Sequence, residues 1–314
     1  ANGDDIENAS LLLEQLREEL PQDGDVLEAY ALVKLRQGDE EEARRLFFEL
    51  LETGDNTADA MFYLARFAEG DRRPEQAVRL YSQVTNGDFV IAAQQRASQI
   101  IRSREGIPAA IEHLDSFISR HARYGLALST VRASLYARGG YFDQSLELYD
   151  DYLTVKPASE FALLARADVL LQSDNLDSAI DAFRAAVKRY PDSPGALNAL
   201  GYTLADRTNK LREAERLIDK ALDKEPDNAA IIDSKGWVLF RRGKFAEARD
   251  YLQRAYDEFQ DAEVAAHLGE VMWRMGDEDE ARELLQEAWQ RQPNDKVLRD
   301  TIRRLMEGGP TTRS

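Results

Sequence analysis

Histidines and carboxylates are the residues of this 314-residue sequence that could carry acid–base or metal chemistry. The three histidines, His113, His121 and His267, form neither an H-E-x-x-H motif nor a ligand pair at i, i+4. Cysteine is absent, which excludes disulfides and thiolate metal sites. Carboxylate runs such as Glu40–Glu42 stand at expected helix starts, where the helix dipole and solvent account for them. We therefore predict no metal, no cofactor and no enzymatic activity.

The composition limits the class of partner. Asp and Glu number 58 against 41 Lys and Arg, so the net charge is −17 and the pI is about 4.8. This balance works against binding to the phosphate backbone of nucleic acid or to an anionic lipid surface. No stretch approaches the roughly 18 consecutive apolar residues of a membrane span. We expect a protein that binds other proteins, with no nucleic-acid partner.

An internal repeat organises the chain. The phrase GDEEEARRLF at 38–47 returns as GDEDEARELL at 276–285, seven periods of 34 residues later. Within each period, apolar residues recur at helical spacing on both sides of a central turn, which predicts a helix hairpin. The blocks start near residues 24, 58, 92, 126, 160, 194, 229 and 262. One column is alanine in six blocks, and we expect these residues to be buried where paired helices cross: Ala43, Ala77, Ala179, Ala214, Ala248 and Ala281.

This pattern resembles the tetratricopeptide repeat (TPR), whose consensus has the same period and the same Leu-Gly, Tyr, Gly, Ala, Phe, Ala and Pro columns. The resemblance covers residues 24–293. It implies an all-α solenoid over 1–307, a right-handed superhelix of about eight full repeats with a half repeat at 1–23 and a capping helix at 296–307. Residues 308–314 are predicted to be disordered. Because the chain begins in mid-repeat, we expect the natural protein to continue N-terminally.

The first helix of each TPR hairpin lines an inner groove, and block positions 2, 5, 9 and 12 tend to point into it. In the last three blocks these positions and position 13 predict a partner-binding surface made of Asn198, Tyr202, Asp233, Trp237, Phe240, Arg241, Glu270, Trp273 and Arg274. Its four aromatic residues are expected to form one strip, and aromatics are common anchors for protein segments.

Alternative interpretations of this surface stay open from sequence. Trp237 or Trp273 can instead pack under the neighbouring hairpin, since aromatic residues are mostly buried. Arg241 and Arg274 can either hold carboxylates or be solvated charges at helix ends. No three blocks supply the Lys, Asn, Asn, Lys and Arg clamp with which one TPR class binds chaperone tails, so we do not predict that activity.

Two further phrases, DSKGWVLFRRG and AAHLGEVMWRMG, fill columns that the TPR consensus leaves free. They are similar to the C-terminal half of TPR outer-membrane lipoproteins of Gram-negative bacteria that bind a carboxyl-terminal processing protease, over at least residues 194–293. The resemblance implies a periplasmic adaptor that brings peptidoglycan (cell-wall) hydrolases to this protease. It also implies tethering to the outer membrane through a lipidated N-terminal Cys, which is not part of this sequence.

Two alternatives remain beside the adaptor: a TPR assembly scaffold without a protease link, and the substrate-binding arm of an enzyme whose catalytic domain lies outside this sequence. The sequence does not indicate which partner occupies the groove.

Overall fold

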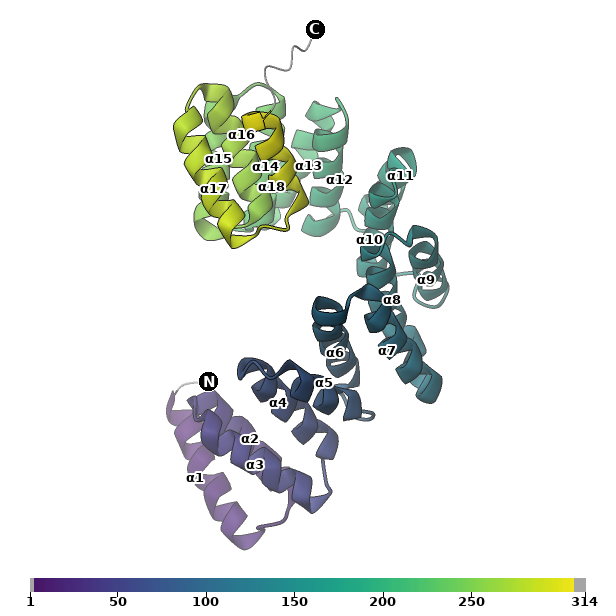
Figure 1. Ribbon diagram of the computed structural model, residues 1–314, viewed down its shortest axis with the longest axis vertical. Coiled ribbons are helices and arrows are strands. Elements are labelled where there is room, and N and C mark those ends of the chain that lie inside the picture. Colours follow the sequence, from purple (N-terminus) through teal and green to yellow (C-terminus); the bar gives the residue numbers. More distant parts are fainter. Residues whose placement is uncertain (1–2, 308–314) are drawn as a thin grey trace. The chain divides into compact units, whose positions relative to one another are not determined.

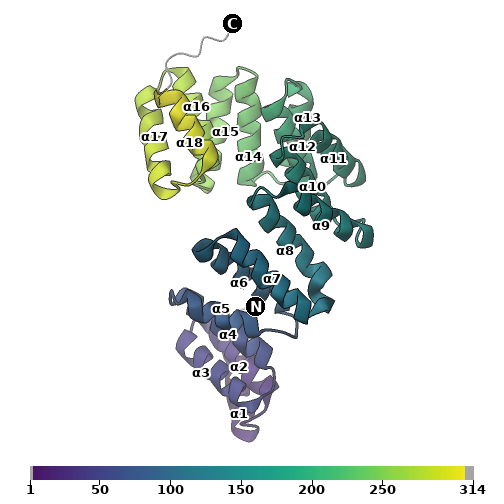
Figure 2. The same ribbon diagram turned by 45° about the vertical axis from the view of Figure 1, so that its right-hand side comes forward.

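The computed structural model describes residues 3–307, and all regular structure in that range is helical. The range holds eighteen α-helices, one 3-10 turn (Ala122–Tyr124) and a closing π-helical turn (Arg303–Glu307). The chain divides after Val155 into two compact units. Figures 1 and 2 show that each unit consists of helices joined by short connections. The predicted all-α solenoid of helix hairpins is confirmed; the expected disorder of 308–314 concerns residues outside the described range.

The helices of the first unit are α1 (Gly3–Glu19), α2 (Gly24–Gln37), α3 (Glu40–Thr53), α4 (Thr57–Gly70), α5 (Pro74–Gln83), α6 (Val90–Glu105), α7 (Ile107–Arg120), α8 (Gly125–Arg138) and α9 (Phe142–Val155). Those of the second unit are α10 (Glu160–Gln172), α11 (Leu176–Arg189), α12 (Pro194–Arg207), α13 (Leu211–Lys224), α14 (Ala229–Arg241), α15 (Phe245–Glu258), α16 (Ala262–Met275), α17 (Glu278–Arg291) and α18 (Lys296–Ile302). From α2 to α17, even-numbered helices are the first helices of hairpins and odd-numbered helices the second. Each first helix begins within two residues of a 34-residue block start.

Local sequence sets the ends of these helices. The Asp23 side chain accepts hydrogen bonds from the backbone N–H groups of Asp25 and Val26, and Ser193 does the same for Ala196. Such caps satisfy N–H groups that the first helical turn leaves without partners. Gly276 ends α16 with φ +98°, a left-handed conformation that glycine adopts without steric cost. These signals restrict most connections to a few residues.

The alanine column lies where the two helices of each hairpin cross. All six predicted alanines are completely buried, which confirms that expectation. In the α14–α15 hairpin the approach is so close that a Cβ on Gly236 would lie 2.5 Å from Leu252 Cγ. Two hairpins of the first unit depart from the column. Ser145 is buried there and donates a hydrogen bond to Ala133 O at 2.8 Å, whereas Ile111 brings a larger apolar side chain.

The C-terminal end of the second unit is covered by α18. Figures 1 and 2 show α16, α17 and α18 side by side, coloured yellow-green to yellow. Leu298 and Thr301 of α18 are buried. The π-helical turn that follows places Arg304 against Glu270 of α16, with both carboxylate oxygens 2.6 Å from guanidinium nitrogens. A helix with one buried face and a charged outer face is the usual end of a repeat array.

Candidate protein-binding groove

Three first helices, α12, α14 and α16, carry all nine of the predicted partner-binding residues. Helix α14 packs between α12 and α16, and every residue from 231 to 240 is buried. This run includes the charged residues Asp233 and Lys235. Buried charges are costly unless they are paired and hydrogen-bonded. Lys235 is paired on the side of α13, where its Nζ lies 2.7 Å from Asp219 and 3.2 Å from Glu215. Asp233 is paired on the side of α16.

The partner of Asp233 is His267, which the sequence-based prediction missed. His267 is 4% exposed, and its Nδ1 lies 2.9 Å from Asp233 Oδ1. Burial lowers the pKa of this imidazole, but Asp233, Glu263 and Asp206 together outweigh burial and raise the pKa above its ordinary value. The raised pKa favours the imidazolium form, in which Nδ1–H donates to Asp233 Oδ1. The pair places a positive and a negative charge inside the unit with their hydrogen bonds satisfied.

Tyr202 and Trp237 complete the surroundings of His267. The Tyr202 hydroxyl donates to Glu263 Oε1 at 2.6 Å and lies 3.4 Å from His267 Nε2, which can donate to the phenolic oxygen. Burial and the neighbouring Glu263 raise the pKa of Tyr202, so this side chain stays a neutral phenol. The Trp237 indole stacks on the imidazole, with ring centroids 4.2 Å apart. We call Tyr202, Asp233, Trp237, Glu263 and His267 the His267 cluster.

On one side of this cluster is a pocket of about 250 Å³. Three of the predicted residues, Asn198, Tyr202 and Asp233, line it. The remaining wall comes from Ala199 of α12, from residues of the first two turns of α14 and the start of α16, and from Phe259, which is 61% exposed in the loop before α16. The charged residues of the lining are Asp233, Asp261 and Glu263, without any Lys or Arg. We call this the acidic pocket.

A second pocket, of about 520 Å³, contains five more predicted residues. The lining of this arginine pocket is Asp206, Trp237, Phe240, Arg241, Gly243, Phe245, Glu270, Arg274 and Arg304. The rings of Trp237 and Phe240 stack with centroids 5.1 Å apart, and Phe245 follows at 5.7 Å from Phe240. Aromatic rings and guanidinium groups therefore share one concave surface.

The arginines of this pocket differ in what they already bind. Arg241 donates to the carbonyl oxygens of Ala205 at 2.6 Å and Thr208 at 3.3 Å, at the end of α12. It is thus neither a solvated charge nor free to hold a partner's carboxylate. Glu270 is likewise occupied, by Arg304. Arg274 is exposed and has no acidic partner within residues 3–307, which leaves it available for a carboxylate.

The two tryptophans, whose exposure the sequence left open, are placed differently. Trp237 is 8% exposed, stacks on His267 of the next hairpin and donates from Nε1 to Asp206 Oδ1 at 3.3 Å, so it packs under the neighbouring hairpin. Phe240 is also buried, at 9% exposed. Trp273 is half-buried and lies outside both pockets, with its ring 5.1 Å from the Arg282 guanidinium of α17. The expected aromatic strip is therefore interrupted: His267 lies between Tyr202 and Trp237, and Trp273 faces α17 instead.

Several residues of the site were absent from the sequence-based prediction. Glu263 stands at position 2 of its block, a position that the period marks as facing the groove, so the pattern contained its signal. Asp206 stands at position 13, the position that predicted Arg241 and Arg274, so the pattern contained its signal too. His267 stands at position 6, which carries no such signal. Arg304 belongs to the cap, where the 34-residue period has ended.

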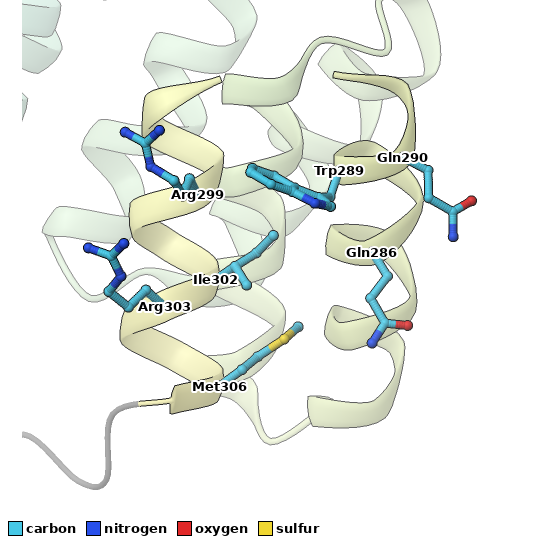
Figure 3. Close-up of a pocket in the computed structure, with 7 residues that line it drawn as sticks. All are labelled: Gln286, Trp289, Gln290, Arg299, Ile302, Arg303 and Met306. Carbon is cyan, nitrogen blue, oxygen red and sulfur yellow. The ribbon is translucent and has the colours of Figure 1, made fainter. Parts of the chain in front are cut away.

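A third pocket, of about 430 Å³, lies at the C-terminal end of the second unit. Figure 3 shows Trp289 of α17, with Ile302 and Met306 of the C-terminal segment, turned toward one another in this pocket. Arg299 and Arg303 point away from the Trp289 ring. The pocket contains none of the predicted residues.

Consecutive helix hairpins with a lined groove define a helical-repeat scaffold, and comparison with known proteins gives the family. Tetratricopeptide-repeat models match residues 130–194, 164–229, 202–263 and 239–305, which together span more than half of the chain. The chain belongs to the tetratricopeptide-repeat family. Proteins of this family are typically non-catalytic scaffolds that bind other proteins.

Individual relatives agree with this assignment. The TPR repeat-containing protein PA4667 of Pseudomonas aeruginosa is 40% identical over 246 residues, which is 78% of this chain and 42% of the relative. The chain thus spans less than half the length of that relative. A tetratricopeptide repeat protein from Parabacteroides merdae has a similar structure, with a TM-score of 0.63 at 18% identity over 79% of this chain and 98% of the other. The TPR protein TTC0263 of Thermus thermophilus covers 58% of this chain with all of its own, at 22% identity and a TM-score of 0.52. These two structures support the fold.

Two searches of the described residues concern membranes and metals. No helix between residues 3 and 307 has both the length and the apolar character needed to cross a membrane. The same residues contain no group of three or more His, Asp or Glu arranged to hold a metal ion.

Proposed function

We propose that this chain is the partner-binding part of a periplasmic adaptor that presents peptidoglycan hydrolases to a carboxyl-terminal processing protease. The observation that carries the proposal is the groove on α12, α14 and α16, where two pockets of different charge open beside the His267 cluster. The resemblance of residues 194–293 to outer-membrane TPR lipoproteins supports the identity of the partners. In the full-length protein, a lipidated N-terminus would provide the tether to the outer membrane.

An adaptor acts by raising effective concentration, because a substrate and a protease held on one scaffold meet intramolecularly. The buried ion pair Asp233–His267 keeps the groove wall in one arrangement, so a guest meets a preformed surface. Arg274, which is exposed and unpaired within the described chain, is the polar contact most available to a guest.

The test is a reconstituted proteolysis assay with the full-length protein, the protease and a purified peptidoglycan hydrolase. We expect the adaptor to accelerate cleavage of the hydrolase. We expect Arg274→Glu to reduce that acceleration at least threefold without changing the melting midpoint, because it reverses a charge in the groove. Arg212→Glu is the matched control, since Arg212 is exposed on α13 and lines neither groove pocket.

Equal cleavage with and without the adaptor would reject the adaptor role and leave a TPR assembly scaffold as the better description. Cleavage of the hydrolase by the full-length protein alone would instead favour the substrate arm of an enzyme.

A further inference from the structure

We propose that the acidic pocket binds one basic side chain, the ammonium group of a lysine or the guanidinium group of an arginine, from an extended segment of a partner protein. The inference rests on the proposed use of the groove for protein guests, but not on which protease or hydrolase the guest is. It is carried by the charge of the pocket, the shape and chemistry of its walls, and an unsatisfied acceptor on Asn198.

The pocket keeps an excess of negative charge. Of its three carboxylates, Asp233 is balanced by His267. Glu263 accepts a hydrogen bond from the neutral Tyr202 hydroxyl, and Asp261 accepts one from the backbone N–H of Glu263 at 2.9 Å. Neither has a cationic partner within residues 3–307. Both carboxylates retain free lone pairs for the N–H groups of a cation.

The walls suit the aliphatic part of a long basic side chain. Small apolar residues, Ala199, Ala230 and Val264, line the pocket between the acidic groups. Phe259 also lines the pocket, with 61% of its surface exposed. Lysine and arginine bury their methylene stems on apolar surface while their charged ends reach polar groups. A pocket with apolar walls and acidic residues matches both parts.

Asn198 gives a separate indication of a missing donor. Its side-chain oxygen Oδ1 is buried and has no hydrogen-bond partner in the described structure. An acceptor that is buried without a donor destabilises the state that contains it. A rotation of the half-buried Asn198 side chain that turns Oδ1 toward the pocket would let a bound ammonium or guanidinium group supply that donor. The pocket lining itself contains no basic residue.

The volume favours a side chain over a bare metal ion. A cavity of about 250 Å³ holds far more than one ion or one water, which needs only roughly 10–15 Å³ by a comparable measure. Two of the acidic groups are also engaged by Tyr202 and His267, so they are not free to converge on one ion. A guest that carries its charge on a stem fills the space and leaves these hydrogen bonds in place.

The test uses three blocked pentapeptides, acetyl-AAKAA-amide, acetyl-AARAA-amide and acetyl-AAQAA-amide, titrated to 10 mM into the chain. Binding is followed by NMR through the side-chain amide signals of Asn198 and the indole N–H signal of Trp237. We expect saturable shifts of Asn198 with the Lys and Arg peptides, no shift with the Gln peptide, and weaker binding at high salt. The ratio of the two affinities distinguishes the ammonium from the guanidinium guest.

Two variants test the pocket while keeping both members of the buried pair, Asp233 and His267. Glu263→Gln keeps an oxygen for the Tyr202 hydroxyl but removes the charge, so binding should weaken about tenfold. Ala230→Leu should block the pocket at a position exposed in α14 and abolish the shifts. Glu283→Gln on α17 is the matched control, since Glu283 is exposed and lies outside all three pockets, and it should bind as the unmodified chain does.

The proposal is overturned if no peptide shifts Asn198, if the Gln peptide binds as well as the others, or if Glu283→Gln weakens binding as much as Glu263→Gln. The last outcome would show that the net charge of the chain attracts basic peptides without a specific site. Proteolysis by the reconstituted adaptor separates this result from the larger proposal. If Glu263→Gln and Ala230→Leu both still accelerate cleavage of the hydrolase, the basic-guest pocket alone is rejected. If neither the unmodified protein nor any variant accelerates cleavage, the adaptor role is rejected.

Discussion

Two histidines, the half-buried His113 in the first unit and the buried His267 in the second, have opposite electrostatic surroundings. His113 of α7 lies 3.0 Å from Gln94 Oε1, and Gln94 also donates to the carbonyl oxygens of Tyr81 and Val84. Burial, with a smaller effect from Arg120, lowers the pKa of His113. In the second unit, His267 faces Asp233, and nearby carboxylates raise its pKa although the side chain is buried. The surroundings of His113 therefore favour the neutral imidazole, and those of His267 favour the imidazolium.

The difference indicates what each cluster does. Gln94 and His113 belong to the two helices of one hairpin, and Gln94 also joins that hairpin to the preceding one through carbonyl oxygens at the end of α5. Asp233 and His267 belong to first helices of successive hairpins and join repeats along the groove wall. Loss of one member of a neutral hydrogen-bond network leaves an unpaired polar group, whereas loss of one member of an ion pair leaves an unpaired buried charge, which destabilises the fold more. The second unit therefore has a groove wall whose stability depends on a few side chains.

The largest expected effect comes from truncating the aromatic member of the His267 cluster. Trp237→Ala should lower the free energy of unfolding by about 4 kcal/mol, because it removes a buried indole that stacks on His267 and bonds to Asp206. Trp273→Ala should cost much less, since that ring is half-buried. Urea unfolding followed by circular dichroism measures both. Equal costs for the two variants would contradict the burial difference.

Breaking the buried ion pair should have the next largest effect. Asp233→Ala should destabilise by about 3 kcal/mol, since His267 then either remains as an unpaired buried charge or loses its proton. The counterpart in the first unit, Gln94→Ala, should cost about 2 kcal/mol, because two carbonyl oxygens lose a donor but no charge is stranded. The same unfolding measurement compares them. A larger cost for Gln94→Ala would invert the proposed contrast.

Overpacking the alanine column should have an intermediate effect that also differs between the units. Ala248→Leu should destabilise by about 2 kcal/mol, because Ala248 is fully buried in a hairpin whose helices already touch at Gly236. Ile111 fills the same column in the first unit, so Ile111→Leu keeps the volume and should cost under about 1.5 kcal/mol. An unchanged melting midpoint for Ala248→Leu would show that this crossing is looser than described.

The smallest expected effect is the pH dependence that the two histidines contribute. The pKa of His267 is raised on folding, so its stabilising contribution is complete below the unfolded pKa of about 6.5 and is lost as pH rises through the folded pKa. The pKa of His113 is lowered, so the unfolded state takes up its proton first and stability falls as pH drops below about 6.5.

The two contributions can be separated by NMR titration of the imidazole Cε1 protons, assigned with His113→Gln and His267→Gln. We expect the His267 signal to titrate above the ordinary histidine pKa and the His113 signal below it. Shifts of both pKa values in the same direction would remove the electrostatic contrast between the units.

Much of the fold could be predicted because the same residue pattern recurs in each 34-residue block. The 34-residue period, the alanine column and the turn residues each recur, so errors at one block are corrected by the others. The departures at Ile111 and Ser145 were visible as breaks in the column. The way each is accommodated, by a larger apolar contact and by the hydrogen bond from Ser145 to Ala133, was not.

The predicted site residues gather around two pockets, but the prediction omitted several of their neighbours. Eight of the nine predicted residues line the two groove pockets, and their role in binding stays a prediction. Block position indicates which way a residue faces, but not what it meets. Arg241 meets carbonyl oxygens of α12, and Glu270 meets Arg304 of the cap. Neither pairing follows from a 34-residue period.

The sequence by itself determined the helix hairpins, their order, their closest crossings and the absence of a recognisable catalytic motif, because these depend on spacing along one chain. Only the tertiary structure decided that Trp237 is buried while Arg274 remains exposed, and that the pKa of His267 is raised. The physical reason is that exposure and pKa depend on groups from other helices. Asp233, 34 residues before His267 in the sequence, lies 2.9 Å from it in the fold.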